Sequence, residues 1–315
     1  MSISTALCQQ LSELDAEISS LRQLLSACEG HRDAVQQELY RAQDRAEKFM
    51  DRWLGYAAAL PLTLIIQSTT QDFPLDRLRS MIYRYSHQVQ ALALDVGACS
   101  DIGELGLYSQ VFPVLHQVLG LAPQLYELHL PQAVALTAPW LQLTRFEGQI
   151  ESIELFDLAP NLIEAKCCLL YTHNNRIIAH ASLQILTVIN DSVDILEFLT
   201  LPSLQSLDIF NMIEYYSLVD FFERSTPPLV SLCVRGEFKQ LDLWHDCLPF
   251  LHHNLKNLEI RCVSGLVMNP LFGCKEEKNL SILRNLKSLT CSDVAYNSFN
   301  LRALVDFLRS RSDTL

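Results

Sequence analysis

The densest group of reactive side chain types lies between residues 245 and 253. His245, Asp246 and Cys247 are consecutive, and His252-His253 follow shortly after them. A Cys–His pair can activate a thiolate, and three histidines can hold a zinc ion. The same segment is an amphipathic helix pattern whose apolar side shares one face: Leu243, Cys247, Leu248 and Leu251. We favour this second interpretation and predict no catalytic residue and no metal ligand here.

No other stretch has the spacing of a catalytic or cofactor site. Gly97, Gly103 and Gly106 lack the spacing and the flanking lysine of a phosphate-binding loop. The G-x-S-x-G pattern of a serine nucleophile is absent. The ten cysteines include the adjacent pair Cys167-Cys168 but no C-x-x-C. The sequence therefore predicts a protein that is not an enzyme and that needs no cofactor and no metal.

Composition narrows the classes of partner. The chain has 315 residues, 49% of them hydrophobic, with 24 Lys+Arg against 36 Asp+Glu and a net charge of -12. Such an apolar chain can bury a large core, which excludes global disorder. Nucleic-acid affinity is built from Lys and Arg, so a nucleic-acid binder is disfavoured. The charge is uneven, because residues 53–254 hold 9 bases and 21 acids (-12) whereas residues 255–315 hold 9 bases and 6 acids (+3).

The sequence also predicts an intracellular location, cytoplasmic or nuclear or both. Its longest apolar run, residues 53–66, contains Pro61 and is shorter than the ~20 residues that a membrane span requires. The first residues lack the basic and apolar regions of a secretory signal. Ten cysteines without such a signal indicate free thiols in a reducing compartment. We expect no membrane partner.

The first secondary-structure element that the sequence predicts is a helix with a heptad pattern. Apolar residues recur at alternating spacings of four and three from residue 7 to residue 39, and only Arg32 is charged: Leu7, Leu11, Leu14, Ile18, Leu21, Leu25, Cys28, Arg32, Val35 and Leu39. A 3.5-residue repeat places these residues in one stripe on a helix. One interpretation is a coiled coil through which residues 7–39 self-associate. The other is a single amphipathic helix lying on its own protein.

An internal repeat organises the rest of the chain. Copies of L-x-x-L-x-[LIV], or its drifted forms, begin at residues 89, 125, 183, 204, 229, 255 and 286, with weaker copies at 143 and 162. From the second copy onward the first anchors are 18 to 31 residues apart, near the ~20–29-residue period of leucine-rich repeats. The last two anchors of each copy point inward from a strand. We expect Cys167, Cys262 and Cys291 to fill such inward slots.

Helical arms are expected between the strands, at 112–121, 153–158, 193–199, 218–224, 243–253 and 301–311. Short strands and helices joined right-handedly form a curved parallel sheet. The predicted fold is therefore α/β: a leucine-rich-repeat solenoid over residues 53–315, preceded by an amphipathic or coiled-coil helix over residues 1–52. The sequence ends at a helix, where the next strand would begin.

Several segments resemble the F-box/leucine-rich-repeat proteins of mushroom-forming (basidiomycete) fungi. The helix LSELDAEISSLRQLL is similar to the helix that precedes the F-box in that family. The step from Trp53-Leu54-Gly55 to Pro61-Leu62-Thr63-Leu64 resembles the one that opens the repeat region. Four further segments resemble successive repeats: APWLQLTRFEG, LAPNLIEAKC, LTLPSLQSLDI and FFERSTPPLVSLCV. The resemblance covers nearly the whole chain and implies the substrate-recognition part of a ubiquitin-ligase receptor.

One part of the family pattern has no counterpart. The family carries an F-box with an L-P-x-E-[IV] opening, which docks on the Skp adaptor of a cullin–RING ligase, between the leading helix and the W-L step. Here Leu39 leads through polar residues directly to Trp53, and no L-P-x-E and no W-R pair occurs. The resemblance therefore leaves binding of a Skp-type adaptor in doubt, and an internal deletion or a skipped exon would explain the gap.

A solenoid binds through the exposed positions of its concave strands. In the best copies these are Tyr126, Glu127, His129, Gln205, Ser206, Asp208, Lys256, Asn257, Glu259, Lys287, Ser288 and Thr290. A mixed polar face of this kind suits a protein partner, and it is also what an ordinary solvated sheet looks like. The expected function is non-catalytic protein recognition, as in an F-box-type receptor. The alternative is a repeat scaffold without a ubiquitin role that self-associates through its N-terminal helix.

Overall fold

In the computed structural model the chain is described at residues 3–56, 60–68, 80, 83–96, 119–120, 122–133, 139–169, 176–189, 193–210, 215–235, 244–251, 254–261 and 285–292. It forms two compact units, Met1–Leu60 and Pro61–Leu315. The predicted ranges were 1–52 and 53–315. Each unit is described by itself.

The first unit is built on one long helix, α1 (Ile3–Tyr56). Its 54 residues make it roughly 80 Å long at 1.5 Å per residue. The predicted helix is thus confirmed, and it continues through Trp53 and Leu54. All its described side chains from Glu17 to Trp53 are exposed. Surface ion pairs support it at helical spacing, with Arg41–Glu38 and Lys48–Asp44 both at 2.8 Å.

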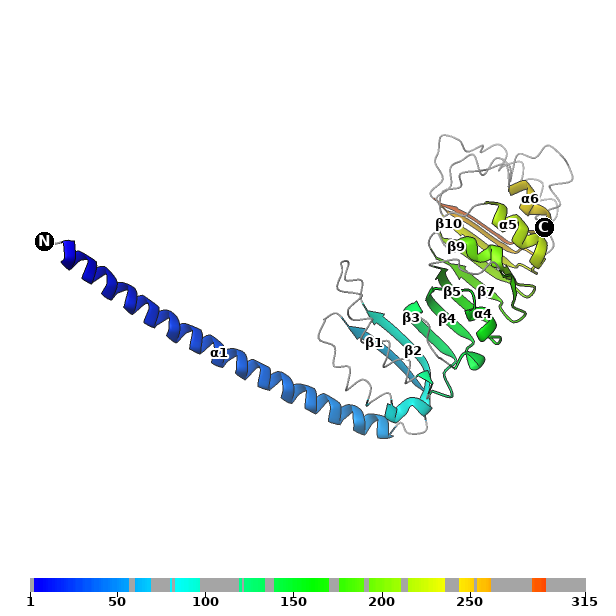
Figure 1. The fold of residues 1–315 in the computed structure, drawn as a ribbon. Coiled ribbons are helices and arrows are strands. Elements are labelled where there is room, and N and C mark those ends of the chain that lie inside the picture. The colour runs from blue at the N-terminus through cyan, green and yellow to red at the C-terminus, as the bar shows by residue number, and fades with distance from the viewer. Residues whose placement is uncertain are drawn as a thin grey trace. The chain divides into compact units, whose positions relative to one another are not determined.

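The second unit is built on a ten-stranded sheet (Figure 1). All neighbouring strands are parallel, in the order β1-β2-β3-β4-β5-β7-β9-β10-β11-β12. The strands are β1 (Leu62–Ser68), β2 (Val89–Val96), β3 (Glu127–Ala133), β4 (Arg145–Ile150), β5 (Glu164–Leu169), β7 (Ile185–Val188), β9 (Ser206–Phe210), β10 (Ser231–Arg235), β11 (Asn257–Arg261) and β12 (Ser288–Ser292). From β2 onward, each strand of this sheet comes from one copy of the sequence repeat, so the predicted parallel sheet is confirmed.

Short helices connect the strands. They are η1 (Ser86–Gln88), η2 (Trp140–Gln142), α4 (Leu155–Leu158), η3 (Val193–Phe198), α5 (Tyr215–Ser225) and α6 (Trp244–Leu251). The arms expected at 153–158, 218–224 and 243–253 correspond to α4, α5 and α6, which lie along one side of the sheet (Figure 1). The arm at 193–199 is a 3₁₀ helix, a form common in short connectors. The arm at 301–311, and most of that at 112–121, lie outside the described residues.

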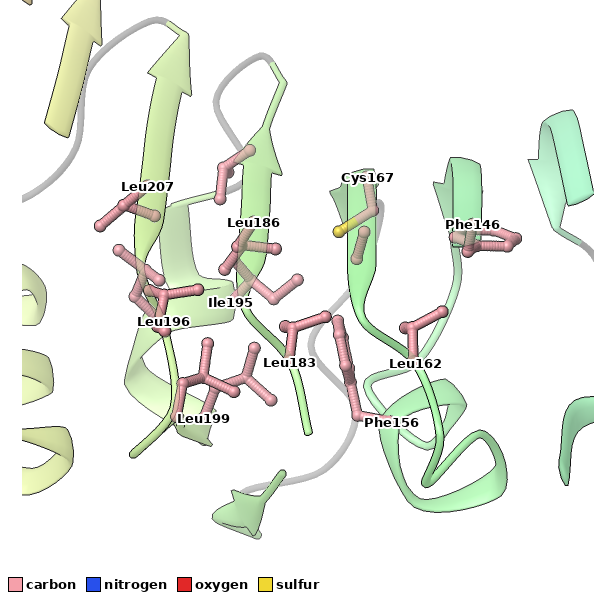
Figure 2. Close-up of a cluster of buried hydrophobic side chains, with 14 of the residues drawn as sticks. Phe146, Phe156, Leu162, Cys167, Leu183, Leu186, Ile195, Leu196, Leu199 and Leu207 are labelled. Atoms are coloured by element: carbon pink, nitrogen blue, oxygen red, sulfur yellow. The ribbon is translucent and has the colours of Figure 1, made fainter. Parts of the chain in front are cut away.

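The core lies between the sheet and these helices. Inward anchors of successive strands are fully buried, among them Ala165, Leu186, Leu207 and Leu232. Figure 2 shows strand anchors gathered with side chains from the connecting segments. The side chains labelled there are Phe146, Phe156, Leu162, Cys167, Leu183, Leu186, Ile195, Leu196, Leu199 and Leu207. Burying such side chains contributes roughly 1.5–3 kcal/mol each relative to exposure. The predicted inward positions are confirmed for these strands.

The predicted inward slots for cysteine have different outcomes. Cys167 is fully buried in β5, as predicted. Cys291 is exposed, so the prediction of a tight apolar slot there is wrong. Its strand, β12, is the last in the described sheet, and only β11 pairs with it. Cys262 lies outside the described residues.

Three strands were not anticipated from the repeat. β1 precedes the first recognised copy, and its LTLIIQS sequence is rich in β-branched residues, which favour strands. β6 (Ile178–Ala179) and β8 (Leu199–Thr200) form a separate two-stranded sheet. Strands this short carry no periodic signal that could reveal them.

Gly148 fits where the main sheet is irregular. The register between β3 and β4 shifts after the pair Leu130↔Gly148, next to Pro131. Proline cannot donate a ladder hydrogen bond and is tolerated at such bulges. Gly148 has a φ of 156°, and a Cβ built there would lie 1.9 Å from the backbone oxygen of Leu130. Only glycine permits this close approach.

Candidate functional site

The described helices α4, α5 and α6 lie along one side of the sheet and leave its other face uncovered, which we call the open face (Figure 1). It consists of the strand residues that alternate with the buried anchors. Its described members from β3 to β12 are Glu127, His129, Arg145, Glu147, Gln149, Glu164, Lys166, Cys168, Ile185, Thr187, Ser206, Asp208, Phe210, Ser231, Cys233, Arg235, Asn257, Glu259, Arg261, Ser288, Thr290 and Ser292. Parallel register aligns these residues in rows that cross the strands.

The residue just before each strand is fixed by a recurring backbone motif. The carbonyl oxygen of Tyr126 accepts hydrogen bonds from the N–H groups of Thr144 (2.8 Å) and Arg145 (3.0 Å). The carbonyl oxygen of Gln205 accepts in the same way from Val230 (2.7 Å) and Ser231 (2.9 Å). This motif gives the position before each strand the same place in successive copies, at the entry edge of the open face.

The sequence-predicted site residues divide between these two locations. Eight lie on the open face: Glu127, His129, Ser206, Asp208, Asn257, Glu259, Ser288 and Thr290. Four lie at the entry edge: Tyr126, Gln205, Lys256 and Lys287. The fold thus brings all twelve to the open face or to its entry edge, and none is buried. Their role in binding stays a prediction.

Across β3, β4 and β5 the open face carries an ionic network. Arg145 lies between two carboxylates, with its Nε 3.3 Å from Glu164 and its Nη1 3.9 Å from Glu127. In the next row the Lys166 ammonium pairs with Glu147. Strand register causes this alternation, because Glu127, Arg145 and Glu164 are cross-strand partners. Opposite charges in such pairs stabilise a sheet modestly.

His129 joins the two rows of the network. Its Nε2 lies 2.9 Å from Oε1 of Glu127, and its Nδ1 lies 3.1 Å from Oε2 of Glu147. Both ring nitrogens can donate only in the imidazolium form. In that form the residue makes two charge-assisted hydrogen bonds, one within β3 to Glu127 and one across to Glu147 of β4.

The middle of the open face is nearly uncharged. β7 contributes Ile185 and Thr187, and Ile163 lies at the entry edge beside it. The exposed fractions are 41% for Ile163 and 38% for Ile185. Single exposed apolar residues of this size are ordinary on protein surfaces. This strip therefore separates two charged regions rather than forming an apolar pocket.

A second charged cluster lies over β9, β10 and β11. Nη2 of Arg235 is 2.9 Å from Asp208, and the Arg235 guanidinium lies over the Phe210 ring, 4.1 Å from its centroid. Arg261 pairs with Glu259. Burial raises the pKa of the Asp208 carboxyl, although the Cys233 thiol and Arg235 act in the opposite direction. The ion pair with Asp208 and the stacking on Phe210 together hold the Arg235 guanidinium in one position.

The sequence interpretation missed more than half of these charged residues. Arg145, Glu147, Glu164, Lys166, Arg235 and Arg261 occupy the open face but were not among the predicted site residues. The first four lie in the weak copies at 143 and 162. Arg235 and Arg261 come one residue after the last anchor of their copies. The alternation of buried and exposed residues along each strand could have found them, if it had been applied to the weak copies and extended one residue beyond the last anchor of each copy.

Two of the described cysteine thiols, Cys167 in β5 and Cys233 in β10, are poor nucleophiles. Burial, with a smaller contribution from the neighbouring Cys168, raises the pKa of Cys167 to about 12. Burial also raises the pKa of Cys233 to about 11, although its Sγ accepts a hydrogen bond from Nε of Arg235 at 3.2 Å. At neutral pH both thiols are protonated, whereas the reactive species is the thiolate.

The reactive group found in the sequence at 245–253 is only partly described. Cys247 is buried in α6, with 1% of its surface exposed, and Leu251 is buried too, as predicted for the helix face. The side chains of His245 and Asp246, and all of His252-His253, lie outside the described residues. Within the described part of the chain, no group of three His, Cys, Asp or Glu side chains could hold a metal ion. None of its helices has the length and apolar character of a membrane span.

Comparison of the sequence with protein-family models and with curated proteins found no match in either. The function must therefore be argued from the geometry of the chain itself.

Proposed function

We propose that this protein is a non-catalytic protein-recognition module, folded as a leucine-rich-repeat solenoid, that binds its partner on the open face. The observation that carries the proposal is that one parallel strand corresponds to each sequence repeat, and that the described helices leave one face of these nine strands uncovered. Repeat proteins of this construction use such continuous surfaces for binding.

The leucine-rich-repeat interpretation is supported by three features together. Nine copies of the pattern coincide with nine consecutive strands, β2 to β12 of the main sheet. The connecting helices contact one another from one repeat to the next, as α5 does with η3 and α6. The core is continuous along the repeats, from Val89 to Ile260. A repeat unit that cannot bury its apolar face alone gains stability by such stacking.

A protein partner fits the open face better than a small molecule or a nucleic acid. The described part of this face mixes paired acids and bases, hydroxyls and a few exposed apolar side chains, as protein-binding surfaces do. Small molecules prefer concave apolar pockets. Nucleic acids require clustered positive charge, whereas this chain has a net charge of -12.

The specific role that we propose is substrate recognition for an F-box-type ubiquitin ligase. It rests on the resemblance of the helix and repeat segments to F-box/leucine-rich-repeat proteins. In that role the chain holds a target near the transferring complex and performs no chemistry. This role requires attachment to a Skp-type adaptor, yet the L-P-x-E opening of the F-box does not occur in the sequence.

A pull-down tests this attachment. The full chain and a relative that carries an intact F-box are each mixed with purified Skp-type adaptor under identical conditions. Co-purification of the adaptor with both chains is the result that the ligase role requires. Retention of the adaptor by the relative alone removes the ubiquitin role and leaves protein recognition.

A second candidate function is a scaffold that self-associates through α1. The stripe residues Ile18, Leu21, Leu25, Val35 and Leu39 are between 43% and 64% exposed. Helices in proteins gain most of their stability by burying an apolar face, and a second copy of α1 offers a matching stripe. The side chains of Leu7, Leu11 and Leu14 lie outside the described residues.

Sedimentation of the full chain tests self-association. In a coiled coil, the double variant Leu21→Lys and Leu25→Lys places four like charges in the seam of a dimer and dissociates it. The matched control, Gln23→Lys and Ala27→Lys, adds the same charge away from the stripe. A native chain that sediments as a monomer overturns this candidate, as does an oligomer that the stripe variant leaves intact.

A further inference from the structure

Lys256 and Lys287 occupy the same position in consecutive repeats. Each lies just before its strand, and the carbonyl oxygen of Lys256 accepts the N–H groups of Lys287 (2.7 Å) and Ser288 (3.0 Å). The next residues, Asn257 and Ser288, are register partners in β11 and β12. Adjacent strands are about 4.8 Å apart, so the backbone fixes the two lysines side by side. Both side chains are exposed.

This arrangement costs free energy in the isolated protein. Like charges directly opposite each other on neighbouring strands repel. Within the described residues neither lysine forms an ion pair, and their neighbours at the same level, Val230, Ser231 and Asn257, are uncharged. A bound anion would relieve this repulsion.

The other cations of the described open face already have partners. Arg145 lies between Glu127 and Glu164, and Lys166 pairs with Glu147. Arg235 and Arg261 pair with one acid each, Asp208 and Glu259. A cation that is already paired must break its ion pair to bind another anion. Within the described residues Lys256 and Lys287 have no ion pair to break. Among the described residues at the open face and its entry edge, the unpaired positive charge therefore lies at the start of β11 and β12.

Uncharged hydrogen-bond donors occupy the first positions of the strands at this edge. Ser231, Asn257 and Ser288 are aligned in one row across β10, β11 and β12. None of the three side chains is buried. Hydroxyl and amide groups donate to carboxylates, so this row extends the anion-binding character beyond the two ammonium groups.

We propose that this lysine pair, with the adjacent Ser–Asn–Ser row, binds an acidic segment of the partner protein. The proposal rests on the function proposed above, because it specifies the chemistry of the partner for the same face. Alternate side chains of an extended peptide lie on one side at intervals of roughly 6.6–7 Å. Glu or Asp at every second residue can therefore face both lysines at once. Long-range attraction also speeds association with an acidic segment.

Fluorescence anisotropy tests the proposal on the full chain. The probe is a fluorescein-labelled peptide of about eight residues in which Glu alternates with Ser, enough to cross three strands. Two matched probes replace Glu with Gln or with Lys, and a labelled single-stranded RNA represents the other class of polyanion. We expect binding of the Glu peptide alone, weakening as the salt concentration rises from about 50 to about 300 mM.

The decisive variant is Lys256→Gln with Lys287→Gln. It removes two positive charges without altering the strands, and we expect it to weaken Glu-peptide binding about tenfold, since exposed ion pairs contribute modestly. The control, Arg176→Glu, changes the net charge by the same amount at an exposed ion pair with Asp157, and we expect unchanged binding.

The remaining outcomes overturn the proposal. They are no binding of the Glu peptide, equal weakening by the control variant, or tighter binding of the RNA. The adaptor pull-down is independent of the two lysines. Adaptor binding without Glu-peptide binding therefore contradicts this inference alone, whereas Glu-peptide binding without adaptor binding contradicts only the ubiquitin role.

Discussion

His180 connects two repeats through its imidazole, whose Nε2 lies 2.9 Å from the carbonyl oxygen of Ala159. Nδ1 of the same ring accepts the N–H of Leu183 at 3.1 Å. These contacts fix the neutral tautomer with the proton on Nε2. The ring is 2% exposed and stands edge-on to Phe156, with 6.1 Å between the ring centroids. A histidine that looks chemically available in the sequence thus satisfies the backbone where two copies meet.

Replacing His180 with Ala should destabilise the second unit strongly. The change leaves a buried carbonyl and a buried N–H without partners, and each unpaired group costs about 1–3 kcal/mol. We expect a loss of about 3 kcal/mol in the free energy of unfolding, measured by urea denaturation. The control, His31→Ala, alters an exposed helix residue and should change it by less than about 0.5 kcal/mol. Equal effects of the two changes would contradict the bridging role.

Two glycines should respond to alanine in opposite directions. Gly148→Ala places a Cβ 1.9 Å from the Leu130 oxygen, so the strands must separate, and we expect a loss above about 3 kcal/mol or failure to fold. Gly30→Ala meets nothing within 4 Å and should stabilise α1 by up to about 1 kcal/mol. Thermal unfolding followed by circular dichroism measures both. A folded, native-like Gly148→Ala protein would show that β3 and β4 are not this close.

Thr226 offers a stabilising substitution. It follows α5 with a φ of 39°, and its N–H donates to the carbonyl oxygen of Phe222 at 2.8 Å. A β-branched residue in this left-handed conformation carries roughly 1–2 kcal/mol of strain that glycine avoids. We expect Thr226→Gly to raise the free energy of unfolding by about 1 kcal/mol. Thr226→Ala keeps a Cβ and should gain less, so an equal gain would argue against backbone strain.

The thiols should differ in reactivity in the folded protein. Cys28 is exposed, whereas burial raises the pKa of Cys233 to about 11 and that of Cys167 to about 12. Iodoacetamide at about pH 8 should therefore modify Cys28 first and leave the other two protected until the chain unfolds. Peptide mapping by mass spectrometry reads the order. Early modification of Cys167 would show that β5 is not packed as described.

The raised pKa values of Cys167 and Cys233 also determine how the free energy of unfolding changes at alkaline pH. A thiol whose pKa is higher in the folded state stabilises the fold while it is protonated in both states. That stability is lost as the pH rises from the unfolded value, near 8.5, through about 11 and 12. Cys167→Ala should reduce the alkaline slope of the unfolding free energy. An unchanged slope in this variant would contradict the burial of the thiol.

The sequence by itself determined the repeating part of this protein. Hydrophobic periodicity requires only local information, so it identified α1 from its heptads and located a strand at each copy of the pattern. It also identified the buried anchors, such as Leu186 and Leu207, because alternation along a strand decides which side chains face the core. Those features follow from neighbours in the chain.

Only the tertiary structure decided which side chains meet. Arg145 lies between Glu127 and Glu164, 18 and 19 residues away along the chain, because the inter-strand register aligns them, and no local pattern encodes that register. The same holds for the bridge from His180 to Ala159 and for the two lysines set side by side by a backbone hydrogen bond. Spacing along the sequence drifts from copy to copy, and the hydrogen-bonded sheet restores the alignment.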